Sequence, residues 1–261
     1  MYLTDLADVL RAEGLPVKEV TGWKTRGRRG GEQMDGVRAI ICHHTAGPAT
    51  GESPSRGVVT YGRPGLGGPL SQMYLSRSGV WHVVAAGKAN HAGAVSNVDY
   101  SNAYAIGVEA EATGTDEWPP DQYVSYAHGV AALVNHWKLS TSTVLGHKEV
   151  GVPLGRKSDP NFRMAAFRVA VDRARVAQRA TRDNPRVAPR FPLKRVLQVE
   201  HPMLHGEDVK TVQRIVRTKV DGWYGPDTAG DVKRWQRAHG LSADGEVGPK
   251  TAAKMGLRWA G

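Results

Sequence analysis

The chain has 261 residues, 40% of them hydrophobic and 23% charged, which is typical of a globular protein and excludes general disorder. This length is enough for one good-sized core, or for one ordinary domain with a smaller one. A formal net charge of +10 favours a polyanionic partner, such as nucleic acid, an anionic membrane or an acidic bacterial envelope, and does not choose among them.

The N-terminal segment has the spacing of a short amphipathic helix. Leu3, Leu6, Val9 and Leu10 would share one side of it, and Gly14 would end it. The segment lacks the basic start and the uninterrupted apolar core of a secretory signal, and the sequence has no apolar run of the roughly 20 residues that span a bilayer. We therefore expect a protein made in a cytoplasm, with no membrane partner, which another component must release if it acts outside.

Two loop-like segments flank the first expected strand. Residues 22–36 are rich in Gly, Arg and Lys, and we expect a surface loop there. The apolar run over residues 37–43 has the length and content of a buried strand. Residues 47–69 are dense in Gly, Pro and Ser, which predicts a long connection with one short helix over residues 55–61. A connection of that length in a compact domain is usually functional.

Strands and helices follow in the middle of the chain. Four segments have the apolar content of strands, namely residues 70–75, 80–84, 104–110 and 143–145. The first two flank a Gly turn and therefore predict a β-hairpin. Helical spacing occurs over residues 121–137 and again over residues 162–180. Pro119 and Pro120 precede the first of these helices, which suits a helix start.

Residues 181–200 have the composition of a linker. Basic residues alternate there with Pro185, Pro189 and Pro192. The run of positive charge indicates either a solvated helix end with a stiff spacer or direct contact with an anionic polymer.

A near-repeat marks the segment beyond this linker. Residues 220–229 and 243–252 each contain an Asp-Gly turn followed by Gly-Pro-x-Thr. Proline stands in the first helical turn, where its missing N–H costs nothing. A helix over residues 231–240 lies between the two copies, and another helix begins near Gly206. We expect three short helices around one small core.

Histidines and a carboxylate with ligand chemistry occur in two places. His43 and His44 end the first expected strand, and a later loop contains His147 and Asp159. Two histidines and one carboxylate, with no fourth protein ligand in view, are the donor set of a catalytic zinc site whose fourth position is open to water. A structural zinc site would usually be closed by several cysteines, but Cys42 is the only cysteine here. A single cysteine also excludes an intramolecular disulfide.

Several of these segments together resemble the zinc amidase family, which comprises type 2 N-acetylmuramoyl-L-alanine amidases, phage lysozyme-amidases and peptidoglycan recognition proteins. The resemblance covers roughly residues 35 to 172 and rests on five motifs, His43-His44-Thr45, His91-Ala92-Gly93, Ile106-Gly107-Val108-Glu109, Gly146-His147 and Arg156-Lys157-Ser158-Asp159-Pro160. The C-terminal unit resembles the three-helix peptidoglycan-binding domain often joined to such enzymes. The combination is similar to a phage endolysin.

This resemblance implies a fold and a domain order. The fold would be α/β, with a mixed central β-sheet flanked by helices (the zinc amidase fold), followed by a small three-helix domain. Residues 1–180 would form the catalytic domain with an N-terminal helical extension. Residues 181–200 would be the basic, proline-containing linker, and residues 201–261 the peptidoglycan-binding domain.

The resemblance also implies the roles of the site residues. His43, His147 and Asp159 would bind Zn²⁺. Glu109 would move protons as general base and acid, and Lys157 would stabilise the oxyanion. Each role has a competing interpretation: Glu111 lies on the same strand face as Glu109, Lys157 is otherwise a surface lysine, and Asp159 otherwise forms a turn before Pro160.

The other histidines are less defined. His91 matches a groove segment of the relatives and either binds substrate or does not contact it. Adjacent strand residues point to opposite faces, so His44 cannot join the same metal as His43, and it is either a groove residue or a packed core residue. Cys42 alternates away from His43 and reads as a small buried apolar side chain. Six histidines lack any matching context and are expected to be structural: His82, His128, His136, His201, His205 and His239.

The implied function is hydrolysis of the amide bond between N-acetylmuramic acid and L-alanine in bacterial peptidoglycan. The implied protein is a monomer made in a host cytoplasm that acts on the cell wall after release. The alternative is a non-catalytic peptidoglycan recognition protein, although such proteins typically lose a zinc ligand. Nucleic acid is not an expected partner, because the basic residues lack an aromatic-interleaved or helix-turn-helix pattern. Ser71 stands where some phage relatives have a tyrosine, which disfavours a tyrosine-assisted mechanism.

Overall fold

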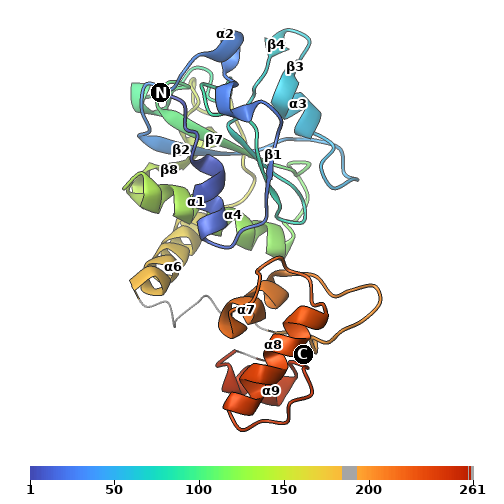
Figure 1. The fold of residues 1–261 in the computed structure, drawn as a ribbon. Coiled ribbons are helices and arrows are strands. Elements are labelled where there is room, and N and C mark those ends of the chain that lie inside the picture. The colour runs from blue at the N-terminus through green and yellow to red at the C-terminus, as the bar shows by residue number, and fades with distance from the viewer. Residues whose placement is uncertain (184–192, 258, 260–261) are drawn as a thin grey trace. The chain divides into compact units, whose positions relative to one another are not determined.

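The computed structural model describes residues 1–183, 193–257 and 259. It divides into two compact units, Met1–Gln178 and Arg179–Gly261, each with an apolar core of its own (Figure 1). The expected linker over residues 181–200 lies partly outside the described residues, and its three prolines are among the residues not described. The exact domain boundaries stay a prediction.

A six-stranded mixed sheet runs through the first unit, with the strand order β1-β6-β5-β7-β2-β8 (Figure 1). The strands are β1 (Val17–Glu19), β2 (Ala39–His44), β5 (Met73–Leu75), β6 (Trp81–Val83), β7 (Ala105–Ala110) and β8 (Val144–Gly146). Only the β5–β6 pair is antiparallel, because a short turn joins these two strands. The neighbouring pairs are parallel, and the expected α/β sheet flanked by helices is confirmed.

Three helices share one core with one face of this sheet. They are α1 (Leu6–Ala12), α4 (Pro120–His136) and α6 (Met164–Asp183). In β2, Ile40 and Cys42 point into this core, whereas Ala39 and Ile41 join a smaller apolar cluster on the other face. The alternation of strand side chains therefore places His43 on the face opposite the helices.

Short elements connect these strands and helices. The helices are α2 (Arg28–Gly31), α3 (Arg56–Tyr61) and α5 (His147–Val150), and the 3₁₀ turns are η1 (Trp23–Thr25), η2 (Val98–Tyr100) and η3 (Thr141–Thr143). A separate two-stranded pair consists of β3 (Gly62–Arg63) and β4 (Leu66–Gly67). The helix predicted inside the long Gly- and Pro-rich connection is therefore present, as α3.

The prediction of a surface loop over residues 22–36 is wrong in part. Trp23 and Met34 are buried, 3% and 1% exposed, and both belong to the main core. The indole N–H of Trp23 donates to Glu19 over 2.6 Å, which anchors the segment to the end of β1. The many Gly and Arg residues of this segment obscured two anchoring side chains.

The second unit consists of the helices α7 (Glu207–Val216), α8 (Pro226–Ala238) and α9 (Pro249–Lys254) around one apolar cluster (Figure 1). The expected small helical domain is confirmed. The helices α8 and α9 both begin with proline, as the repeated Gly-Pro-x-Thr motif predicted.

The near-repeat extends to a buried glutamine in each copy. The side-chain amide of Gln213 donates to Asp221 Oδ1 over 2.9 Å, and its carbonyl accepts from the N–H of Gly222 over 2.8 Å. Gln236 makes the same pair of bonds in the second copy, to Asp244 Oδ1 over 2.7 Å and from Gly245 over 2.9 Å. Each glutamine thus fixes the Asp-Gly turn that follows its own helix.

We expect Gln236→Ala to lower the free energy of unfolding of the second unit by about 2–3 kcal/mol, because the buried N–H of Gly245 would lose its acceptor. Urea titration of the full chain, followed by the signals of the second unit, measures this change. Gln198→Ala is the matched control, since Gln198 bonds only to Glu200 at the surface and should cost no more than about 0.5 kcal/mol. Equal effects of the two substitutions would contradict the role given to the buried glutamine.

Candidate metal centre and active site

His43 is held at the end of β2 by the strands and by one helix. It lies opposite Glu109 in the parallel register of β2 and β7. Its backbone N–H donates to the hydroxyl of Tyr126 on α4 over 3.1 Å, and that hydroxyl donates to the carbonyl of Val108 over 2.9 Å. A buried tyrosine therefore joins the two strands at the point where both candidate side chains leave the sheet.

His147 opens the short helix α5, directly after β8. Glu149 of the same helix accepts a hydrogen bond from the N–H of Gly146 over 2.9 Å, which caps the helix start. Arg168 of α6 makes two hydrogen bonds to the Glu149 carboxylate, over 2.9 and 3.1 Å. The main core thus sets the position of His147.

Asp159 lies on a loop that is tied back to α5. The backbone N–H of Lys148 donates to the carbonyl of Asp159 over 2.8 Å. The ammonium group of Lys148 donates to the carbonyls of Pro160 and Phe162, over 2.6 and 2.7 Å. These three bonds hold the loop next to His147.

The three predicted ligands converge. Asp159 Oδ2 lies 2.9 Å from His43 Nδ1 and 3.2 Å from His147 Nδ1. One ligand atom of each residue lies within 4.8 Å of the other two. Tetrahedral zinc with bonds of 2.0–2.1 Å would separate such atoms by about 3.3 Å. The two measured distances are close to that value.

Hydrogen bonds to the opposite ring nitrogens orient both imidazoles. His147 Nε2 lies 2.9 Å from the carbonyl of Ala92, an acceptor, so Nε2 carries the proton and Nδ1 keeps its lone pair. His43 Nε2 lies 3.3 Å from Nδ1 of His91, whose own Nε2 donates to the carbonyl of Ala105 over 3.1 Å. Such outer contacts fix the tautomer of metal-binding histidines, and they suit coordination through both Nδ1 atoms.

The charges of the cluster favour a cation. Burial lowers the pKa of His43 to about 4 even though Asp159 opposes the change, so the ring is neutral at neutral pH. Burial alone would raise the pKa of Asp159, but its close contacts with the His147 and His43 imidazoles outweigh that effect and hold the pKa well below its usual range. A neutral imidazole beside a carboxylate is the state that a metal ion requires.

Glu109 and Glu111 lie on the same sheet face and have opposite environments. Glu109 Oε1 is 4.0 Å from His43 Nδ1, and its Oε2 is buried without a hydrogen-bond partner among the described residues. Burial, and then the charge of Asp159, raise the pKa of Glu109 to about 8. A carboxyl group that is poorly solvated and close to the cluster is suited to proton transfer.

Glu111, in contrast, is fully buried and saturated with donors. It accepts hydrogen bonds from the hydroxyl of Thr45 over 2.9 Å, from the N–H and hydroxyl of Ser55 over 2.9 and 3.0 Å, and from the hydroxyl of Tyr74 over 2.6 Å. A carboxylate with this many donors stabilises the packing of α3 on the sheet. It has no remaining contact to offer a reacting group.

Lys157 lies beside the cluster. Its positive charge lowers the pKa of both Glu109 and His43. Its side chain passes close to the backbone, since a Cβ on Gly151 would lie 3.1 Å from Lys157 Cγ. The structure therefore brings the predicted cation to the ligands and to Glu109.

The remaining sequence candidates are buried. His91 is 6% exposed and packs on Gly107, where an added Cβ would lie 2.6 Å from the imidazole ring. Its contacts orient His43, and its contact with substrate stays a prediction. His44 is packed on the opposite face and accepts from the N–H of Asn161 over 3.2 Å. Cys42 is fully buried in the main core, as its alternation predicted.

Sequence reasoning missed two residues that build the site. Tyr126 lies inside the helix predicted over residues 121–137, and Lys148 directly follows the candidate ligand His147, but neither residue was given a role. The helical spacing could not show that the Tyr126 hydroxyl reaches His43, 83 positions away in the sequence. The only signal in the sequence for a role of Lys148 was its position directly after the candidate ligand His147.

We expect Asp159→Asn to lower zinc affinity by more than the 10–100-fold that changes outside the ligand set typically cause. The amide would remove the only negative charge among the three ligands. Isothermal titration with Zn²⁺ and elemental analysis of the purified protein measure the change. His136→Ala is the control, because His136 is bonded to Asp5 at the surface. Unchanged zinc content in Asp159→Asn would contradict the ligand assignment.

Comparisons with known proteins agree with this geometry. Residues 32–162 match the family model for N-acetylmuramoyl-L-alanine amidase, and residues 205–255 match the family model for a peptidoglycan binding domain. No curated protein matches the chain.

Solved structures of low sequence identity also match. One is an endolysin, the N-acetylmuramoyl-L-alanine amidase LysCS from Clostridium intestinale URNW, with 18% identity over 60% of this chain and 97% of that chain, at a TM-score of 0.44. Another is the hydrolase AmiA of Staphylococcus aureus in complex with its ligand, with 14% identity over 64% of this chain and 85% of that chain, at a TM-score of 0.47. The family match spans half of the sequence, and the chain therefore belongs to the N-acetylmuramoyl-L-alanine amidase family and has a C-terminal peptidoglycan-binding domain.

Proposed function

We propose that this protein is a zinc-dependent hydrolase that cuts the amide bond between N-acetylmuramic acid and L-alanine in peptidoglycan. The observation that carries the proposal is a cluster of three potential metal ligands, His43, His147 and Asp159. Next to it lies the Glu109 carboxyl group, whose Oε2 has no hydrogen-bond partner among the described residues. Both lie inside the part of the chain that matches the amidase family.

His43, His147 and Asp159 would hold the metal. Three protein donors leave a coordination position open, which is the pattern of catalytic rather than structural zinc sites. When bound, zinc supplies a Lewis acid that lowers the pKa of water and polarises a carbonyl oxygen. The hydrogen bonds of His147 to Ala92 and of His43 to His91 keep both rings in the binding orientation.

Glu109 accepts a proton from the attacking water and later gives a proton to the leaving amine of L-alanine. Its raised pKa supports both transfers, because it makes the carboxylate a stronger base toward the water, and the protonated carboxyl group is then the acid for the leaving amine. Its unpartnered oxygen supports the same role, since no described hydrogen bond must be broken to reach the water.

Lys157 offsets the negative charge that develops on the carbonyl oxygen of the scissile amide. Its electrostatic effect on Glu109 and His43 supports a position within reach of that oxygen. His91 positions His43 from behind, and a direct contact between His91 and the substrate is the less supported of its two interpretations, because the ring is buried.

We also propose that the protein acts as an endolysin: a monomer, made in a host cytoplasm, that reaches the cell wall after release. The family match to an amidase and the match to a wall-binding domain in one chain support this arrangement. Within the described ranges, no helix has the length and apolar character needed to cross a membrane.

Purified cell wall incubated with the protein should release new L-alanine amino termini, and removal of zinc by a chelator should abolish the release. Chemical labelling of free amino groups followed by identification of the labelled amino acid measures the product. Added zinc should restore activity. Wall binding without any new L-alanine termini would instead identify the non-catalytic recognition protein.

We expect Glu109→Gln to keep zinc and to lower kcat by about 10²–10⁴-fold, because the amide cannot take a proton from water. Turnover of a soluble muropeptide, together with zinc content, separates this loss from loss of metal. Glu117→Gln is the matched control on an exposed residue. Full activity in Glu109→Gln would move the proton-transfer role elsewhere.

Deletion of residues 190–261 should weaken attachment to intact wall more than it lowers cleavage of a small soluble muropeptide. Each unit has its own core, so the first unit is expected to keep its site. Pull-down with insoluble wall and turnover of the soluble substrate, measured on the same preparation, make the comparison. An equal loss on both substrates would refute the division of labour between the two units.

A further inference from the structure

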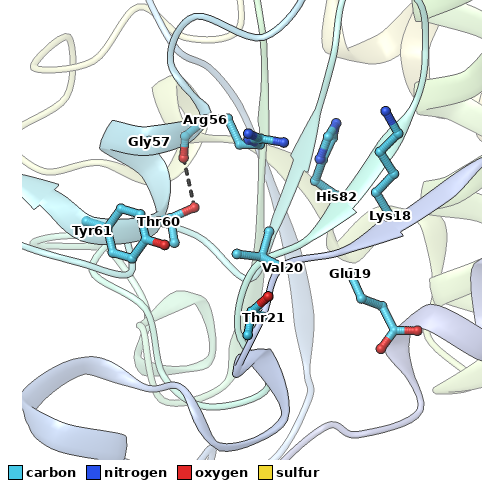
Figure 2. Close-up of a pocket in the computed structure, with 9 residues that line it drawn as sticks. All are labelled: Lys18, Glu19, Val20, Thr21, Arg56, Gly57, Thr60, Tyr61 and His82. Atoms are coloured by element: carbon cyan, nitrogen blue, oxygen red, sulfur yellow. Dashed lines mark hydrogen bonds between the residues drawn. The ribbon is translucent and has the colours of Figure 1, made fainter.

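A polar cavity of about 510 Å³ lies beside β1, β6 and α3. Figure 2 shows the side chains that line it, among them Lys18 from β1, His82 from β6 and Arg56 from α3. The volume falls within the range of small-molecule sites, about 300–1,000 Å³. Neither the sequence motifs nor the family match gives this cavity a role.

The cavity lies on the same sheet face as the metal-ligand cluster and is separated from it by α3. A register row runs across the sheet from His43 to Glu109, Tyr74, His82 and then Lys18. Three strand spacings of about 4.8 Å place His82 roughly 14 Å from His43. Val59 of α3 packs on Tyr74 in the middle of this row, so a group bound in the cavity does not reach the cluster directly.

Two positively charged side chains, Lys18 and Arg56, line the cavity. Lys18 is the register partner of His82, and no ion pair of Lys18 or Arg56 occurs in the described part of the chain. In Figure 2 the His82 and Lys18 side chains project in the same direction, and the Arg56 side chain extends from α3 toward His82. Burial, and then the charges of Arg56 and Lys18, lower the pKa of His82 to about 4, so its ring is neutral at neutral pH.

The two nearby carboxylates are engaged by other groups. Glu19 accepts from the indole of Trp23 over 2.6 Å and pairs with Arg11 over 2.7 Å. Glu52, whose charge acts on His82 in the opposite sense to Arg56, accepts from the N–H of Ser78 over 3.3 Å and from its hydroxyl. Lys18 and Arg56 are therefore available to bind an anion, whereas the Glu19 and Glu52 carboxylates already accept hydrogen bonds from other groups.

His82 has a buried ring nitrogen without a hydrogen-bond partner in the described part of the chain. Its side chain is 3% exposed, and its Nδ1 is buried without a hydrogen-bond partner among the residues that the structure describes. Buried polar atoms in native proteins nearly always have a partner, and an exception calls for a ligand or a water. The His82 side chain lines a cavity that Lys18 and Arg56 also line, so a ligand bound there would lie next to an imidazole and two cations.

We propose that this cavity binds an oxyanion, a carboxylate or a phosphate, carried by a larger group. The guanidinium fork of Arg56 matches the paired oxygens of either oxyanion, Lys18 adds a point charge, and the imidazole of His82 completes the polar wall. Tyr61, 74% exposed, offers an aromatic face at the rim for the rest of the group. That the oxyanion belongs to a wall polymer, as a stem-peptide carboxylate or a polyol phosphate, rests on the proposed function.

Nuclear magnetic resonance of the His82 ring in the full chain tests this site. Two probes are titrated in Tris chloride: inorganic phosphate, and a free wall stem peptide whose only oxyanions are carboxylates. We expect saturable shifts of the His82 ring signals and a rise in the His82 pKa, because a bound anion favours the charged imidazolium. A response to one probe alone names the source of the oxyanion, and a response to both supports the shared chemistry.

The matched variants are Arg56→Gln in the cavity and Arg63→Gln on the exposed strand β3. The Arg56→Gln variant should bind the probes about tenfold or more weakly than the parent, because it loses a charged hydrogen bond. The affinity of the Arg63→Gln variant should stay within about twofold of that of the parent. Equal affinity of the two variants for both probes, or absence of a saturable His82 response, would overturn the site.

The same titration is repeated with phenanthroline, a neutral chelator that adds no oxyanion. Binding at the cavity should persist when zinc is removed, because none of the metal-ligand residues lines the cavity. A protein that binds the probes but never hydrolyses wall would refute the proposed function and leave the cavity site intact. A protein that hydrolyses wall but shows no His82 response would do the reverse.

Discussion

The parallel pairing of β2 with β7 is the contact on which the site depends. It sets His43 directly opposite Glu109, so one proposed ligand and the proposed proton-transfer group leave the sheet side by side. The hydroxyl of Tyr126 then bridges the two strands behind them. The other two ligands arrive from outside the sheet, on α5 and on the loop that Lys148 anchors. A slip of one residue in the β2–β7 register would turn His43 away from Glu109 and into the helical core.

Glu109 and Glu111, two residues apart, have opposite hydrogen-bonding environments: Glu109 has an unpartnered oxygen among the described residues, and Glu111 does not. Both carboxyl groups are on the same face and two residues apart. Glu111 meets donors from three separate segments, and it fastens α3 to the sheet. Glu109 lies next to the three-donor cluster, with its Oε1 4.0 Å from His43 Nδ1. Its Oε2 accepts no hydrogen bond from the described residues. Satisfaction of hydrogen bonds, not residue type, separates their roles.

Much of this arrangement was accessible from the sequence. The convergence of His43, His147 and Asp159 could be predicted because the motifs that carry them resemble a known family, and the roles given to Glu109 and Lys157 stay predictions. Alternation along a strand correctly separated His43 from Cys42. Long strands and helices were also predicted, because periodicity is clear over six or more residues. The short strands β5, β6 and β8 were predicted because each lies in an apolar run, whereas β1, β3 and β4 have two or three residues without such a run and were missed.

The contacts that orient the ligands were out of reach for a different reason. The bonds of His43 to His91, of His147 to Ala92 and of Tyr126 to Val108 join segments far apart in the chain. The local amino-acid composition does not predict such long-range contacts. The buried Trp23 and Met34 were hidden for the related reason that Gly and Arg dominate their segment. The cavity around His82 likewise exists only once β1, β6 and α3 meet.

The doubled glutamine in the C-terminal unit has an evolutionary consequence. Gln213 and Gln236 each bind the turn that follows their own helix, so each copy of the motif supplies the acceptor for the glycine N–H of its own turn. A module built in this way can be lengthened by tandem duplication of its coding segment, because an inserted copy brings its own partners and leaves no amide stranded. Selection could then alter the outward-facing side chains of one copy while the other preserved the scaffold.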